Sequence, residues 1–67
     1  AYSKELVELI FEQPYTRIPT LEARGIAKRQ TASVYLQELC RAGLLTPHKS
    51  GRDMVFVNDS LLRILND

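Results

Sequence analysis

Residues 25–36 have the sequence GIAKRQTASVYL, and this stretch decides the fold. Gly25 is typical of the residue that follows a helix, because glycine adopts the left-handed backbone with which many helices end. Apolar side chains then recur at Ala32, Leu36 and Leu39, which is the spacing of one buried helical stripe. The stretch therefore predicts the end of one helix, a short turn and the beginning of a longer helix.

That longer helix is expected over residues 28–42, and Gly43 is well placed to end it. Toward the N-terminus, residues 15–18 predict a short strand, and Pro19 is expected to open the helix that Gly25 ends. A first helix is expected over residues 2–13, from a capping Ser3 to Pro14, which has no N–H to donate. Five apolar side chains would form its buried stripe: Leu6, Val7, Leu9, Ile10 and Phe11.

A hairpin and a last helix are expected after Gly43. Residues 44–46 would form its first strand and end at Pro47, residues 49–52 its basic turn, and residues 54–57 its second strand. Asn58 would cap the last helix, which holds four apolar side chains: Leu61, Leu62, Ile64 and Leu65. We expect these side chains to close the core, with contact to another chain or domain as the alternative.

The order helix, strand, helix, helix, strand, turn, strand, helix is that of a winged helix-turn-helix. The sequence thus predicts a mostly helical α+β fold, with a three-helix core, a β-hairpin wing and a short C-terminal helix. The alternative is another small α+β domain. With 67 residues, the chain has room for one domain, residues 1–67.

Charge is unevenly spread along the chain, although its net value is only +1. Residues 27–52 carry five cations and one acid, a balance of +4, whereas residues 1–26 and 53–67 sum to −1 and −2. A basic block between acidic flanks indicates an anionic partner.

The third helix and the hairpin turn carry the residues that we expect to contact DNA or a protein partner. They lie in the first turn of the helix, along the face opposite its buried stripe, and beside Gly51. The candidates are Lys28, Arg29, Gln30, Ser33, Val34, Gln37, Arg41, Lys49 and Arg52. Glutamine and arginine suit base edges or phosphates. Val34 cannot hydrogen-bond to either, and it suits a thymine methyl group or a protein surface.

The beginning of this helix supports an anionic partner. Ala27 would be a poor N-cap, and the cations Lys28 and Arg29 follow it, against the helix dipole. A bound phosphate would use both the free N–H groups and the two charges. The alternative is an exposed turn that tolerates a small loss of stability.

No catalytic, metal-binding or cofactor-binding motif is visible, so we expect this chain itself not to be an enzyme. It contains one cysteine and one histidine, without a phosphate-binding glycine loop or a Gly-x-Ser-x-Gly elbow. His48 is expected at the surface, and Cys40 as a buried, unreactive thiol. The sequence has no membrane-spanning run, and a cytoplasmic location is expected.

Nearly the whole chain resembles the C-terminal winged-helix domain of a bacterial subgroup of Fic family proteins. The residues 25–36 carry the specific part of this resemblance. The supporting residues are Glu5-Leu6, Ile10-Phe11, Gln13-Pro14-Tyr15, Gly43, Gly51-Arg52, Phe56-Val57-Asn58 and Leu61-Leu62.

The resemblance implies that the chain is a C-terminal part of a longer protein. Fic proteins typically transfer AMP from ATP, with Mg²⁺, to a hydroxyl group of a target protein. Their motif His-Pro-Phe-x-x-Gly-Asn-Gly-Arg is absent here, because the only histidine, His48, is followed by Lys49 and Ser50. No catalytic residue can therefore be assigned.

Two functions remain open from the sequence. The chain would be an accessory domain of a protein adenylyltransferase, docking on the catalytic domain, on a partner protein or on a twin subunit. Alternatively, it would be the DNA-binding domain of a bacterial transcriptional regulator, with the third helix in the major groove and the wing on the backbone.

Overall fold

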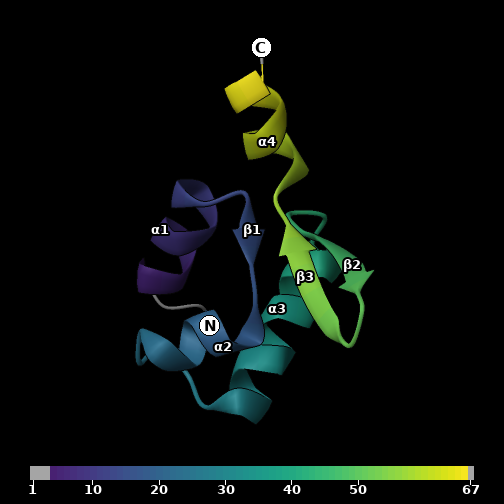
Figure 1. Cartoon of the computed structure of the whole chain (residues 1–67). Helices are drawn as coiled ribbons and strands as arrows, with labels where there is room; N and C mark the ends of the chain where they lie inside the picture. The colour runs from purple at the N-terminus through teal and green to yellow at the C-terminus, as the bar shows by residue number, and fades with distance from the viewer. Residues whose placement is uncertain (1–3, 67) are drawn as a thin grey trace.

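Four helices and three strands make up the part of the chain that the computed structural model describes, residues 4–66 (Figure 1). The helices are α1 (Lys4–Glu12), α2 (Ile18–Ala23), α3 (Arg29–Arg41) and α4 (Asp59–Asn66). The strands are β1 (Tyr15–Thr16), β2 (Thr46–Ser50) and β3 (Asp53–Val57). This is the predicted α+β winged helix-turn-helix. The expected beginning of the first helix at Tyr2 and its cap Ser3 lie outside the described residues.

The core lies between α1, α2, α3 and the inner face of the sheet. Its buried side chains are Leu6, Leu9 and Ile10 of α1, Leu21 of α2, Ala32, Leu36 and Leu39 of α3, and Leu45 and Phe56. The stripe predicted on α3 is confirmed. On α1 the predicted stripe is too wide, because Val7 and Phe11 are 41% and 54% exposed.

Both glycines expected to end helices do so in the same way. After α2, the N–H of Gly25 donates to the carbonyl of Glu22 and that of Ile26 to Leu21, each at 3.0 Å. After α3, the N–H of Gly43 donates to Cys40 and that of Leu44 to Leu39, again at 3.0 Å. These are Schellman motifs, and φ values of +69° and +81° at the two glycines explain why glycine is favoured there.

The beginning of α2 is one residue earlier than predicted, so the expected strand at residues 15–18 is only Tyr15–Thr16. Ile18 is the first residue of α2 and Pro19 the second, after the N-cap Arg17. Proline costs nothing there, because N–H groups in the first turn of a helix have no partner within the helix.

The wing differs most from the prediction. Its first strand is Thr46–Ser50 rather than residues 44–46, and Pro47 lies inside it. Ser50 pairs with Asp53 across the two-residue turn. In an antiparallel ladder, pairs with and without hydrogen bonds alternate from there. Pro47, which lies opposite Phe56, is therefore at a position that makes no hydrogen bonds to β3. The sheet order β1-β3-β2 makes β2 an edge strand. Proline is tolerated there because its missing N–H would have pointed outward.

The last helix does not close the core, which corrects the prediction favoured from its apolar content. Figure 1 shows α4 pointing away from α1, α2 and α3. None of its described residues is buried, and Ile64 and Leu65 are 69% and 62% exposed. Leu61 and Leu62, nearer the sheet, are half-buried.

Asn58 holds the beginning of α4 and is confirmed as its cap. Its side-chain Oδ1 accepts the N–H of Leu61 at 3.1 Å, while its Nδ2 donates to the carbonyl of Ile10 at 2.8 Å. Its own N–H donates to the carbonyl of Pro14. One side chain, only 3% exposed, therefore joins α4 to the end of α1.

Candidate interaction face between α3 and the wing

The helix α3 places the candidate contact residues opposite its buried stripe. Gln30, Val34 and Gln37 are exposed, Val34 to 50%, and Ser33 is half-buried. The N-cap is Lys28 rather than Ala27, and it makes no side-chain cap. The two cations therefore lie at the N-terminus of α3 as predicted, and its first turn, which begins with Arg29, contains no acid.

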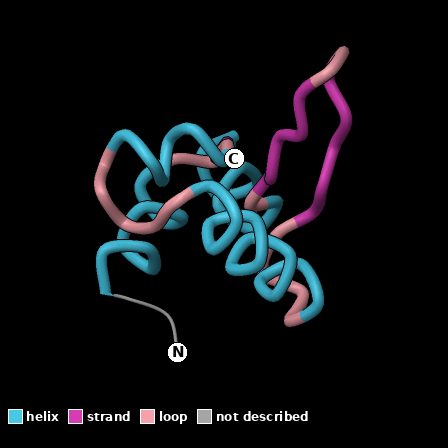
Figure 2. The backbone as a smooth tube through the Cα atoms, turned by 90° about the horizontal axis from the view of Figure 1, so that it is seen from below, coloured by secondary structure: helices cyan, strands magenta, loops and turns pink. Residues whose placement is uncertain are grey.

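The wing stands out from the helical body (Figure 2). Residues of the wing, α2 and α3 line a cleft. The cleft consists of two adjoining hollows of about 420 and 370 Å³, which share Ile18 and Met54 in their walls. The first hollow is also lined by Arg17, Pro19, Glu22, Arg29, Arg52 and Asp53. The second is also lined by Ser33, Gln37, Cys40, Arg41, Pro47 and Phe56. We call the two together the α3–wing cleft.

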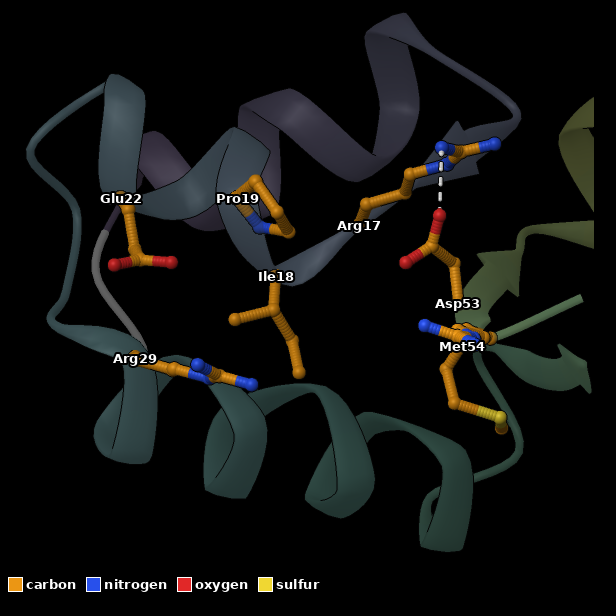
Figure 3. Close-up of a pocket in the computed structure, with 8 residues that line it drawn as sticks. Arg17, Ile18, Pro19, Glu22, Arg29, Asp53 and Met54 are labelled. Atoms are coloured by element: carbon orange, nitrogen blue, oxygen red, sulfur yellow. Dashed lines mark ion pairs between the residues drawn. The ribbon is translucent and has the colours of Figure 1, made fainter. Parts of the chain in front are cut away.

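Figure 3 shows how the first hollow is built from α2, α3 and β3. Ile18 and Met54 both project toward α3, and Arg29 extends from α3 beside Ile18. Arg17 reaches Asp53 across its upper edge, with 3.6 Å between Nη1 and Oδ2. Both side chains are more than half exposed, so this pair stabilises the fold little. Its effect is to join the beginning of β3, next to the hairpin turn, to the N-cap of α2.

Five of the nine candidates line this cleft: Arg29, Ser33, Gln37, Arg41 and Arg52. The other four are exposed but line neither hollow: Lys28, Gln30, Val34 and Lys49. The prediction missed Ile18, Pro47 and Met54, whose place in the cleft depends on how the hairpin lies over α3. The alternation along residues 54–57 did put Met54 and Phe56 on one face.

Charge on this face is unneutralised. Among residues 4–66, ion pairs join Lys4 to Glu8, Arg17 to Asp53, and Arg24 to Glu12. Within the same residues, none of the five cations of the basic block is in an ion pair: Lys28, Arg29, Arg41, Lys49 and Arg52. All five are exposed and belong to α3, its N-cap or the wing. The electrostatic potential of this face is therefore positive.

Cys40 is half-buried in the wall of the second hollow, less enclosed than predicted. Burial raises the pKa of its thiol, because the thiolate would lose solvation. At pH values above about 9 the unfolded chain then loses the proton more readily than the folded chain, which lowers stability as pH rises.

We expect alkylation of Cys40 by iodoacetamide to need a higher pH in the folded chain than in urea, because only the thiolate reacts. The measurement is the alkylation rate against pH, with and without denaturant. Coincident midpoints would contradict the raised pKa.

No group of three or more His, Cys, Asp or Glu side chains lies close enough to hold a metal ion among residues 4–66. His48 is exposed and lines a third hollow on the other face of the sheet, together with Tyr15, Arg17, Val55, Val57, Asp59 and Leu62. No helix of the described part is long and apolar enough to cross a membrane.

Comparison with protein families agrees with the geometry and with the resemblance seen in the sequence. Residues 1–61 match the model of the family described as "Protein adenylyltransferase SoFic-like, C-terminal domain". The matched part includes α1, α2, α3, the wing and the beginning of α4. The chain therefore belongs to the SoFic-like family of protein adenylyltransferases, as their C-terminal domain.

Proposed function

We propose that this chain is a non-catalytic accessory domain of a Fic-type protein adenylyltransferase. Its α3–wing face, by which we mean the cleft and the exposed surface of α3 and the wing around it, would bind another protein surface. That surface would belong to the catalytic domain or to a partner protein. ATP and Mg²⁺ would be bound by the catalytic domain of the enzyme, as the resemblance to Fic proteins implies.

The observation that carries this proposal is the mixture of charge and exposed apolar surface on one face. Val34 and Met54 are 50% and 40% exposed, on α3 and β3 respectively. The five unpaired cations belong to α3, its N-cap, β2 and the hairpin turn. An apolar centre with a charged rim is typical of protein–protein interfaces.

In a full-length adenylyltransferase, the double change Arg29→Glu and Arg41→Glu is expected to slow AMP transfer to its protein acceptor about fivefold or more. Opposing charge at the rim of an interface slows association and weakens the complex. The measurement is incorporation of labelled AMP, with circular dichroism to verify the fold.

Arg63→Glu is the matched control, because Arg63 is an exposed cation of α4 that lines neither hollow of the cleft. It should leave AMP transfer unchanged. If the double variant also transfers AMP to the acceptor at the normal rate, the α3–wing face does not serve the enzyme and the proposal is wrong.

Duplex DNA is the second candidate partner, and one observation favours it. The N-terminus of α3 has free N–H groups and two exposed cations, Lys28 and Arg29, with no acid in its first turn. A phosphate could use both features. On this alternative, binding would weaken steeply with salt, and Lys28→Glu with Arg29→Glu would abolish it.

A further inference from the structure

We propose that the α3–wing cleft binds an acidic amphipathic helix of a partner protein. This inference rests on the proposed function, since it names the chemistry of the surface that the face would hold. Three features of the cleft carry it: its length, its apolar floor and the sign of its charges.

The length of the cleft suits a helix of about three turns. Arg29, in the first turn of α3, lines one hollow, and Arg41, in the last turn, lines the other. The cleft therefore runs along most of α3, a distance of about 18 Å at 1.5 Å per residue. A partner helix of about 12 residues would span the same distance.

Apolar side chains line part of both hollows, beside the charged residues of the first, and we call them the apolar floor of the cleft. Ile18 and Met54 lie in the walls of both hollows, and Pro47 and Phe56 lie in the second. Phe56 is almost fully buried, but Met54 remains 40% exposed at the surface. An unfilled apolar floor between two walls is the surface into which an amphipathic helix places its apolar stripe.

The charges around this floor favour acids. Four arginines line the two hollows: Arg17, Arg29, Arg41 and Arg52. Against them stand only Glu22 and Asp53, of which Asp53 is paired with Arg17. The second hollow contains no acid, and Arg41 is its only charged lining residue among those described. Glutamates on the rim of a partner helix would meet unpaired guanidinium groups at both ends.

A protein helix uses this cleft more fully than a DNA duplex would. A duplex offers phosphates to the arginines but nothing apolar for Ile18 and Met54 except thymine methyl groups. The amide of Gln37, which would read a base, donates to the hydroxyl of Ser33 at 3.1 Å within α3. The apolar floor therefore favours a protein helix over a DNA duplex as the partner.

The test titrates the chain into fluorescein-labelled probes and follows their anisotropy. The first probe is a helical peptide of about 14 residues, with leucines along one stripe and glutamates beside it. The second has the same composition in scrambled order, so that the stripe is lost but the charge is kept. The third is a duplex of about 20 base pairs.

We expect the striped peptide to bind at least about tenfold more tightly than the scrambled peptide, because only the former fills the apolar floor. Arg41→Glu should weaken its binding about tenfold, and Met54→Gln should also weaken it, because it makes the floor polar without changing the charge of the rim. Arg63→Glu should leave it unchanged. Binding should also slow the alkylation of Cys40, which lines the second hollow.

Equal binding of the two peptides would overturn the inference, because charge alone would then explain it. Tight binding of the duplex with none of the striped peptide would overturn it in favour of DNA, and binding of no probe would also overturn it. The proposed function is tested separately by AMP transfer. If Arg29→Glu with Arg41→Glu slows transfer but no peptide binds, the accessory role stands and the acidic helix is wrong.

Discussion

Replacing Asn58 by alanine is expected to lower the free energy of unfolding by about 3 kcal/mol. Loss of the cap on Leu61 accounts for about 1 kcal/mol, and loss of the buried bond to the Ile10 carbonyl accounts for most of the rest. A domain of this size is stabilised by only about 3–10 kcal/mol in total. The variant should therefore melt at least about 12 °C lower, as measured by circular dichroism and urea titration.

Asn58→Ser divides this effect into its two parts. The serine hydroxyl can still cap α4, but it is too short to reach the Ile10 carbonyl, so about two-thirds of the loss should remain. Asn66→Ala is the matched control, because Asn66 is exposed at the other end of the same helix. A loss below about 1 kcal/mol for Asn58→Ala would show that α4 is not held to α1 by this side chain.

Local signals predicted most of the helices and the place of each stop. Gly25 and Gly43 end α2 and α3 because glycine readily adopts the left-handed backbone of this helix ending. Asn58 caps α4 for an equally local reason. These residues act on their immediate neighbours, so their effect can be read without knowing the tertiary structure.

The errors arose where a distant part of the chain decides the outcome. Pro47 would break a central strand, and only the sheet order shows that β2 is at the edge. The apolar residues of α4 indicate burial, but nothing local says whether they meet the core. Val7 and Phe11 are apolar for no reason that the described part of the chain explains.

The candidate site was predicted in the same uneven way. Helical periodicity alone puts Arg29, Ser33, Gln37 and Arg41 on one side of α3, and all four line the cleft. Met54 and Ile18 belong to other elements and reach the cleft only because the hairpin and α2 pack against α3. The basic rim was thus visible in the sequence, and the apolar floor required the structure.

Replacing Thr16 by valine is expected to raise the free energy of unfolding by about 1–2 kcal/mol. Thr16 is 1% exposed and pairs with Phe56 on the inner face of the sheet. Its Oγ1 is buried and has no hydrogen-bond partner among the described residues. On folding, this hydroxyl loses its hydrogen bonds to water and gains none in return. Valine has nearly the same shape and replaces the hydroxyl by a methyl group, which avoids this cost. Urea titration should show a higher midpoint with an unchanged slope.

Thr46→Val makes the same chemical change on the same sheet, but it should lower the free energy of unfolding rather than raise it. Thr46 also pairs with β3, but it is exposed and its hydroxyl donates to Oδ2 of Asp59 at 2.6 Å. Its loss should lower the free energy of unfolding by about 0.5–1 kcal/mol. Both substitutions change the β propensity by the same amount, so the difference between their effects on the free energy of unfolding reports the environment of the hydroxyl group. If Thr16→Val is destabilising, the Thr16 hydroxyl must have a partner in solution, and its burial is not the cost inferred here.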